Sequence, residues 1–134
     1  MAGYSNTPLI RKLGIKEGYR AYVLQPPAHY FDWLSPLPDD IQFRSTLAGT
    51  FDFIHLFVTE EPVFRREFLK AKKHLAKSGM LWVSWPKKAS KVATTLDENK
   101  VRDFGLLNGL VDVKVCAVDE VWSGLKFVFR LVDR

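Results

Sequence analysis

The 134-residue sequence lacks the features that place a protein in a membrane or in an oxidising compartment. Its longest apolar stretch is interrupted by His55 and is far shorter than the roughly 20 residues that a membrane span needs. The first six residues have neither a charged region nor an apolar run, so we expect no signal peptide. The single cysteine, Cys116, can form no internal disulfide and cannot hold a metal ion alone. These absences predict a soluble, cytoplasmic protein.

The sequence also has no internal repeat, no low-complexity tract and no linker that is poor in apolar residues. With 47% hydrophobic and 13% aromatic residues it is too apolar to be disordered. A chain of this length can bury a core of its own, so we expect one domain over residues 1–134. The net charge of +5 favours anionic ligands but is too small to indicate a nucleic-acid-binding protein by itself.

The centre of the chain has the pattern of a strand, a helix and a second strand. Phe51 to Val58 and Met80 to Trp85 are too continuously apolar for strands with one wet face, which predicts central strands of a parallel sheet covered on both sides. Between them, apolar residues recur at steps of four, three and four, as on one face of a helix. These residues are Phe64, Phe68, Ala71 and Leu75. We expect this helix to run from Glu60 to Lys77 and to end at Gly79.

The flanking segments continue the alternation of helices and strands. We expect further helices over residues 7–14, 28–34 and 95–108, and further strands over residues 19–24, 41–44, 111–118 and 125–131. Thr95 to Glu98 fits a capping box at the start of the last helix. The last two strands are close enough in sequence to form an antiparallel hairpin. The predicted fold is therefore a three-layer α/β domain with a mixed sheet of about six strands, mostly parallel, that ends in this hairpin.

This order of elements resembles the Rossmann-like fold of class I S-adenosylmethionine (SAM)-dependent methyltransferases. The segment Gly49 to Ile54 resembles the lead into the fourth strand of that fold, where a Phe-Asp pair is common. Two other segments, Leu110 to Lys126 and Trp85 to Lys88, more closely resemble a bacterial domain family of unknown function. This second resemblance covers nearly the whole chain. The methyltransferase resemblance implies the strand order 2-1-3-4-6-5.

Two residue patterns that a methyltransferase of this class needs are missing. The turn after the first strand normally contains glycines, because side chains would block the approach of the cofactor and the backbone donors must be free. Here the turn reads Gln25-Pro26-Pro27-Ala28-His29, in which two residues have no N–H group. After the second strand, Arg44 and Ser45 stand where an acid would bind the ribose hydroxyls. These differences disfavour SAM, and we expect no cofactor.

Ligands of open α/β sheets bind outside the carboxyl ends of the parallel strands, which locates the candidate site. The candidate ligand-binding residues at this rim are Gln25, Pro26, Pro27, His29, Glu60, Glu61, Trp85, Lys87 and Lys88. Lys87, Lys88 and Lys91 near Trp85 have the composition of a site that binds a phosphate and stacks a base. The simpler interpretation, which we favour, is a solvated basic loop with Trp85 packed beneath it.

The other titratable residues favour structural roles. His29 with Glu60 and Glu61 is the one acid–base grouping that the rim offers, and ordinary surface residues are the favoured interpretation. His55 lies inside a predicted core strand, which indicates a hydrogen-bonded structural histidine. We interpret Asp119-Glu120 as a charged turn and not as a metal site, and Cys116 as a buried, inert thiol. We therefore name no catalytic residue and no metal ligand.

Three hypotheses for the function follow. The first is a methyltransferase-like module without catalytic activity that binds a protein partner or a small anionic ligand. The alternative is a SAM-dependent methyltransferase with an atypical cofactor loop. The third is weak binding of single-stranded nucleic acid through Trp85 and the neighbouring lysines, which we consider the least favoured.

Overall fold

The computed structural model describes residues 7–134, so the first six residues, where we predicted no signal peptide, lie outside the described part. Within residues 7–134, no helix combines the length and the apolar character needed to cross a bilayer. The strands are β1 (Arg20–Leu24), β2 (Gln42–Arg44), β3 (Phe51–Phe57), β4 (Leu75–Pro86), β5 (Leu110–Ala117) and β6 (Trp122–Phe129). The helices are α1 (Leu9–Leu13), α2 (Tyr30–Leu34), α3 (Glu61–Lys73) and α4 (Glu98–Leu107), with 3-10 turns η1 (Lys88–Ser90) and η2 (Leu131–Asp133).

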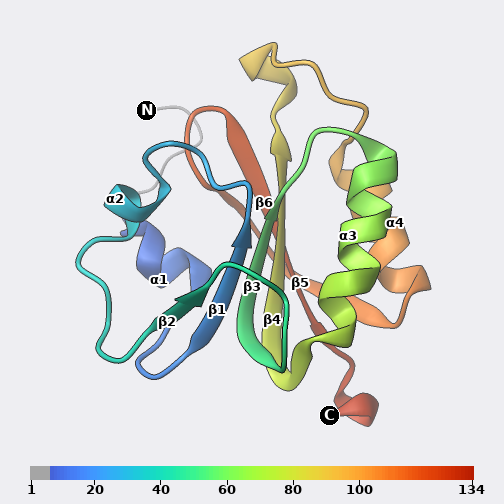
Figure 1. The fold of residues 1–134 in the computed structure, drawn as a ribbon. Coiled ribbons are helices and arrows are strands. Elements are labelled where there is room, and N and C mark those ends of the chain that lie inside the picture. The colour runs from blue at the N-terminus through green and yellow to red at the C-terminus, as the bar shows by residue number, and fades with distance from the viewer. Residues whose placement is uncertain (1–6) are drawn as a thin grey trace.

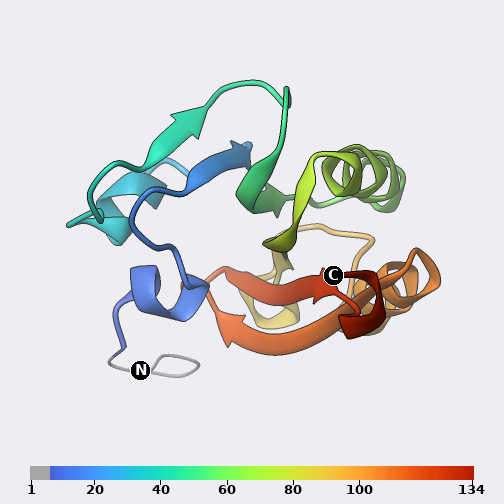
Figure 2. The same ribbon diagram turned by 90° about the horizontal axis from the view of Figure 1, so that it is seen from below.

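The six strands form one sheet in the order β2-β1-β3-β4-β6-β5. The pairs among β1, β2, β3 and β4 are parallel, whereas β6 is antiparallel to both β4 and β5. The predicted fold class and strand order are therefore confirmed. Helices α1 and α2 cover one face of the sheet and α3 and α4 cover the other, so the fold has three layers (Figures 1 and 2).

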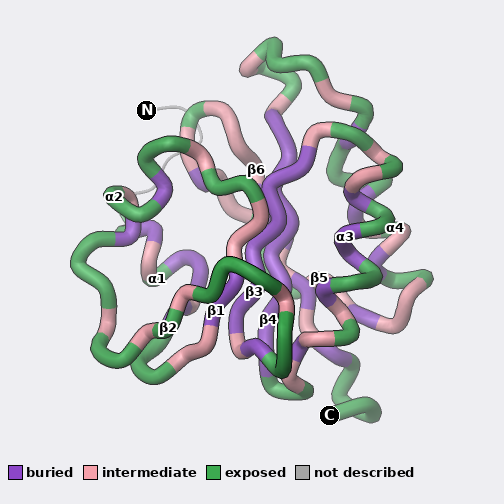
Figure 3. Tube along the Cα trace, viewed as in Figure 1, coloured by how far each residue is buried: buried purple, intermediate pink, exposed green. Residues whose placement is uncertain are grey.

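The central strands bury side chains on both faces, as their continuous apolar sequence predicts. On the face under α3 and α4, Ile54 and Leu56 of β3 pack with Phe64 and Phe68 of α3. On the opposite face, Phe53 and other aromatic residues pack under α1 and α2. Burial is consequently concentrated in β3 and β4, at the centre of Figure 3.

The helix predicted over residues 60–77 is shorter than expected, and that boundary is wrong. Helix α3 ends at Lys73, and the chain enters β4 at Leu75, which pairs with Phe51. The side chain of His74 donates from Nδ1 to the carbonyl oxygen of Gly49 (2.7 Å). Gly79 is not a helix terminator but lies within β4, where an added Cβ would come within 3.0 Å of the carbonyl oxygens of Ala76 and Asp52. The apolar period continued through Leu75 because that side chain is buried in a strand, not in a helix.

The capping box predicted for the last helix is also wrong. Helix α4 begins at Glu98, and its N-cap is Asp97, two residues after the predicted cap Thr95. The side chain of Asp97 accepts a hydrogen bond from the backbone N–H of Lys100 (2.8 Å). The hydroxyl oxygen of Thr95 instead accepts from the backbone N–H of Glu61 (2.7 Å), in the first turn of α3. The segment before α4 is therefore fixed to the start of α3, which brings it to the carboxyl ends of the parallel strands, where ligands of such sheets bind.

Candidate functional site

The strand order defines one point at which the chain reverses its direction of winding. From β1 the chain moves outward to β2, whereas from β3 it moves the other way to β4. In open α/β sheets ligands bind outside the carboxyl ends of the strands at such a point. Here it is bordered by Gln25 to His29 after β1 and by Thr59 to Glu61 after β3, and we call these two segments the switch-point rim.

The turn after β1 adopts a conformation that the sequence did not reveal. Gln25 has a φ of 49°, which is the left-handed region that glycine usually occupies. Within residues 7–134, the backbone N–H groups of Ala28 and His29 donate no hydrogen bond. The turn therefore combines the tight reversal of a glycine turn with two free donors, although Pro26 and Pro27 contribute none.

A buried side chain anchors this turn to the sheet. Tyr30, the first residue of α2, is fully buried, and its hydroxyl lies 2.9 Å from Nδ1 of His55. On the other side of the ring, His55 Nε2 lies 2.8 Å from the hydroxyl oxygen of Ser84. Burial lowers the pKa of His55 from 6.5 to about 3 and raises the pKa of Tyr30. The predicted structural role of His55 is confirmed, since a ring with 0% exposure meets no substrate.

The segment after β3 is covered by the chain that precedes α4. The carbonyl oxygen of Thr59 accepts from the backbone N–H of Thr95 (3.0 Å) and from the hydroxyl of Thr94 (2.6 Å). The carboxylate of Glu60 accepts from the Thr95 hydroxyl (3.2 Å). Glu61 pairs with Lys100 of α4 at 3.6 Å. Both predicted rim acids therefore help to hold the segment before α4 against the end of β3.

The structure does not assemble the acid–base grouping that His29, Glu60 and Glu61 offered in the sequence. The nearest charged partner of His29 is Asp32 at 3.6 Å, and both side chains are exposed. Glu61 pairs with Arg65 at 2.7 Å and with Lys100 at 3.6 Å. These residues are surface residues, as we favoured.

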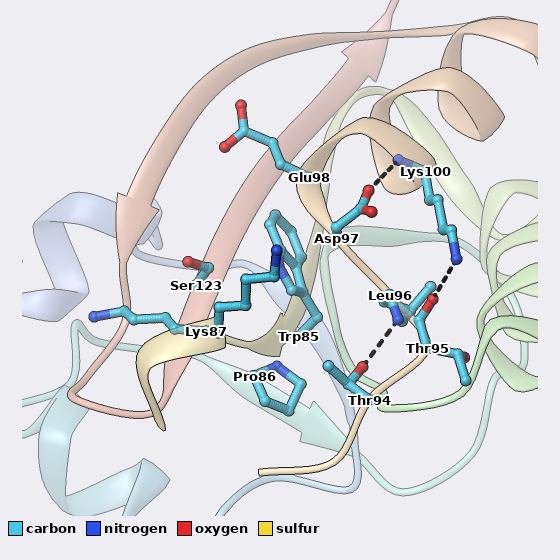
Figure 4. Close-up of a pocket in the computed structure, with 11 residues that line it drawn as sticks. Trp85, Pro86, Lys87, Thr94, Thr95, Leu96, Asp97, Glu98, Lys100 and Ser123 are labelled. Carbon is cyan, nitrogen blue, oxygen red and sulfur yellow. Dashed lines mark hydrogen bonds between the residues drawn. The ribbon is translucent and has the colours of Figure 1, made fainter. Parts of the chain in front are cut away.

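A pocket of about 450 Å³ lies at the carboxyl end of β4, next to the start of α4 (Figure 4). We call it the β4–α4 pocket. The residues that line it are Trp85, Pro86, Lys87, Lys88, Thr94, Thr95, Leu96, Asp97, Glu98, Lys100 and Ser123. Three predicted site residues, Trp85, Lys87 and Lys88, are thus brought together, while Lys91 lies outside the lining. The sequence did not reveal Thr94 to Glu98 as lining residues, because only the contact between the segment before α4 and the start of α3 brings them here.

Trp85 is only 5% exposed and belongs to the core under α3 and α4. The expectation that Trp85 packs beneath the basic loop is therefore confirmed, and its ring has little face free for stacking a base. The ammonium of Lys87 donates to the carbonyl oxygen of Asp119 (2.8 Å), which fixes the loop to the β5–β6 turn. In that turn, Asp119 accepts from the backbone N–H groups of Val121 and Trp122 (2.9 and 2.7 Å), as an ordinary charged turn does.

Two further sequence interpretations concern reactive groups. No group of three or more potential metal ligands forms among the residues that the structure describes. Cys116 is half-buried in β5, and burial is the main cause of its raised pKa, which keeps the thiol protonated. Asp52, from the Phe-Asp pair in the resemblance, accepts from the backbone N–H of Arg20 (2.9 Å) near the amino ends of β1 and β3. Asp52 therefore lies at the amino ends of these strands, whereas the switch-point rim lies at their carboxyl ends.

Comparison with known proteins identifies the class of fold. No family model matches the chain, and no curated protein matches its sequence. Solved structures do match, among them a SAM-dependent methyltransferase from Aquifex aeolicus with a TM-score of 0.60 and 16% identity, over 89% of this chain and 86% of that one. Fibrillarin from Aeropyrum pernix, with natively bound SAM, matches with a TM-score of 0.60 and 14% identity over 94% of this chain and 70% of its own. DhpI in complex with S-adenosylhomocysteine (SAH) matches with a TM-score of 0.61 and 11% identity over 90% and 81%. The chain has the Rossmann-like fold of class I SAM-dependent methyltransferases.

The comparison corrects one expectation and reorders two others. Our prediction of no cofactor is contradicted, because proteins with this fold include ones solved with SAM or SAH bound. The same matches favour the methyltransferase alternative over the module without catalytic activity. The closer resemblance to a bacterial domain family of unknown function stays a prediction, since no family model matches the chain.

Proposed function

We propose that this protein binds SAM at the switch-point rim and is a cytoplasmic methyltransferase whose cofactor turn contains no glycine. The observation that carries the proposal is the backbone of Gln25, whose φ of 49° reproduces the left-handed turn after β1 without a glycine. The strand order supports it, because the point of reversal lies between β1 and β3. The structures with bound SAM and SAH that share this fold support it as well.

The residues present fit one end of the cofactor better than the other. The free backbone N–H groups of Ala28 and His29 suit the methionine carboxylate, since a hydrogen bond from a backbone N–H to an ionised carboxylate is charge-assisted. After β2, the exposed Arg44 offers no acceptor for the ribose hydroxyls, and Ser45 offers only one hydroxyl. When bound, SAM supplies a methyl group on a positively charged sulfur for transfer to a nucleophile. We expect the affinity to come mainly from the turn after β1.

The proposal predicts that a β-branched residue at Gln25 abolishes cofactor binding. A left-handed backbone costs an ordinary residue about 1–2 kcal/mol, and a β-branched side chain tolerates it worst, so Gln25→Val distorts the turn. We expect isothermal titration calorimetry with SAH to show saturable binding to the wild type. The Gln25→Val variant should bind at least about tenfold more weakly, which corresponds to about 1.4 kcal/mol.

Lys91 provides a matched control for this experiment. It is also exposed and has a φ of 62°, but it lies outside the switch-point rim. Lys91→Val therefore introduces the same kind of backbone strain at a distance and should leave the SAH affinity within about twofold, well below the effect of a lost contact. Absence of SAH binding to the wild type, or an equal loss in both variants, would contradict the proposal.

A further inference from the structure

The β4–α4 pocket lies beyond β4 and has no part in the proposed cofactor turn. Its volume of about 450 Å³ falls in the usual range of small-molecule sites, which is about 300–1,000 Å³. It is built by segments that are distant in sequence: the end of β4 with the loop after it, the chain that leads into α4, and Ser123 at the start of β6. In Figure 4, Lys87 and Ser123 lie on one side of Trp85, and Asp97 and Lys100 lie on the other.

The cations of the pocket are not all used by the protein. Within the described part of the chain, the ammonium of Lys88 makes no hydrogen bond or ion pair, and neither does the hydroxyl of Ser123. Lys87 uses one of its three donors on Asp119. Lys100 is the more engaged cation: its ammonium donates to the carbonyl oxygen of Thr95 (2.8 Å) and pairs with Glu61 at 3.6 Å. The pocket therefore presents positive charge and available donors mainly from Lys87, Lys88 and Ser123.

The two acids in the lining do not cancel this charge. Asp97 is occupied as the N-cap of α4, where one carboxylate oxygen accepts from the N–H of Lys100 (2.8 Å). Glu98 pairs with Arg102 at 2.6 Å, and its carboxylate points away from Trp85 in Figure 4. Glu98 is thus paired within α4 and Asp97 is held as its cap. Lys87 and Lys88, which form no ion pair among the described residues, therefore determine the charge that a ligand meets.

The wall of the pocket is apolar next to these charges. Trp85 and Leu96 keep only 5% of their surface exposed here, and Pro86 and the methylene groups of the lining lysines add to the apolar surface. An inorganic anion leaves such a wall in contact with water, whereas a ligand with an apolar part covers it and gains the free energy of that burial. We propose that the β4–α4 pocket binds a small molecule that carries a phosphate next to an aromatic or apolar group.

Phenyl phosphate has both parts of this ligand and serves as the probe. In a nuclear magnetic resonance titration of the ¹⁵N-labelled wild type, we expect shifts of the Lys88 and Ser123 backbone N–H signals and of the Trp85 indole N–H signal. Phenyl phosphate should bind about tenfold more tightly than inorganic phosphate, which lacks the apolar part, and more tightly than phenol, which lacks the charge.

Lys88→Met and Lys91→Met form a matched pair, because each removes one positive charge from the same basic loop and only Lys88 lines the pocket. At about 150 mM salt, where charges are screened over about 8 Å, we expect Lys88→Met to weaken phenyl phosphate binding about five- to tenfold and Lys91→Met less than twofold. Equal effects of the two variants would overturn the inference, as would phenyl phosphate that binds no more tightly than phosphate or phenol.

This inference and the proposed function fail separately. SAH calorimetry on Lys88→Met should give the wild-type affinity, because Lys88 lies outside the switch-point rim. A wild type that binds phenyl phosphate at these signals but not SAH would remove the methyltransferase proposal and leave the pocket. The reverse result would remove the pocket alone.

Discussion

Replacing His55 with leucine is expected to lower the free energy of unfolding by about 2–6 kcal/mol, because it leaves two buried hydroxyls without a partner at about 1–3 kcal/mol each. The two hydroxyls are those of Tyr30 and Ser84, which lie 2.9 and 2.8 Å from the two ring nitrogens. All three residues have 0% exposure, so water cannot replace the lost partner. Urea unfolding followed by circular dichroism at pH 7.5 measures the change.

The triple variant Tyr30→Phe, His55→Leu, Ser84→Ala is the control for this result. It removes the polar side-chain groups of all three hydrogen-bonded residues. No buried side-chain donor or acceptor among them is then left unsatisfied, and much of the lost stability should return. Two outcomes would contradict the role of the hydrogen bonds that link Tyr30, His55 and Ser84 in holding the turn after β1. One is a leucine variant as stable as the wild type, and the other is a triple variant that is the least stable of the three proteins.

The same leucine variant isolates the contribution of His55 to the pH dependence of stability. The folded-state pKa of His55 is about 3, against 6.5 for an unburied ring. The unfolded protein therefore binds more protons between these values, and the folded protein loses stability as the pH falls below 6.5. Between pH 7 and pH 5 we expect the wild type to lose about 2 kcal/mol more than the leucine variant. Parallel pH profiles of the two proteins would contradict the assignment.

Replacing Gly105 with alanine is expected to destabilise the protein by about 3 kcal/mol, although an alanine in an exposed helix position normally stabilises by about 1 kcal/mol. Gly105 is buried in α4 against the ring of Phe127. An added Cβ would lie 2.6 Å from Cζ and 2.8 Å from Cδ1 of that ring, and closer still to Cε1. Phe127 itself has 0% exposure and cannot move outward. Thermal and urea unfolding measure the effect.

Leu107→Ala provides a control in the same helix. Leu107 is 82% exposed, so its truncation should change the stability by no more than about 0.5 kcal/mol. Combining Gly105→Ala with Phe127→Leu should recover part of the loss, because a smaller side chain leaves room for the methyl group. An alanine variant that is as stable as the wild type would show that α4 does not pack against β6 as closely as the structure has it. Since α4 begins at the β4–α4 pocket, a shift of this helix should also weaken phenyl phosphate binding.

The fold was predictable because its strongest signals are local. The apolar continuity of β3 and β4 indicates burial on both faces, and the two segments over residues 111–131 are close enough to pair as a hairpin. Element boundaries were less predictable. Leu75 continues the helical period of α3 but is buried by pairing with Phe51, a contact between segments that no local pattern contains.

The site was less predictable than the fold because it depends on conformation and on long-range crossings. The proline-rich turn after β1 correctly indicated a departure from the glycine pattern, but the left-handed φ of Gln25 cannot be read from its side chain. The capping pattern from Thr95 was interpreted within one helix, whereas the hydroxyl of Thr95 binds the backbone of Glu61 in another. The segment Thr94 to Asp97 therefore covers the end of β3 and supplies four of the eleven residues that line the β4–α4 pocket.

The central claim is that the turn Gln25 to His29 holds the methionine end of SAM, and a crystal structure of the protein grown with SAH tests it most directly. The account predicts electron density for SAH at the carboxyl ends of β1 and β3, with its carboxylate within hydrogen-bond distance of the backbone N–H groups of Ala28 and His29. Density for SAH at any other place, or clear density for the turn with no ligand at saturating SAH, would contradict it.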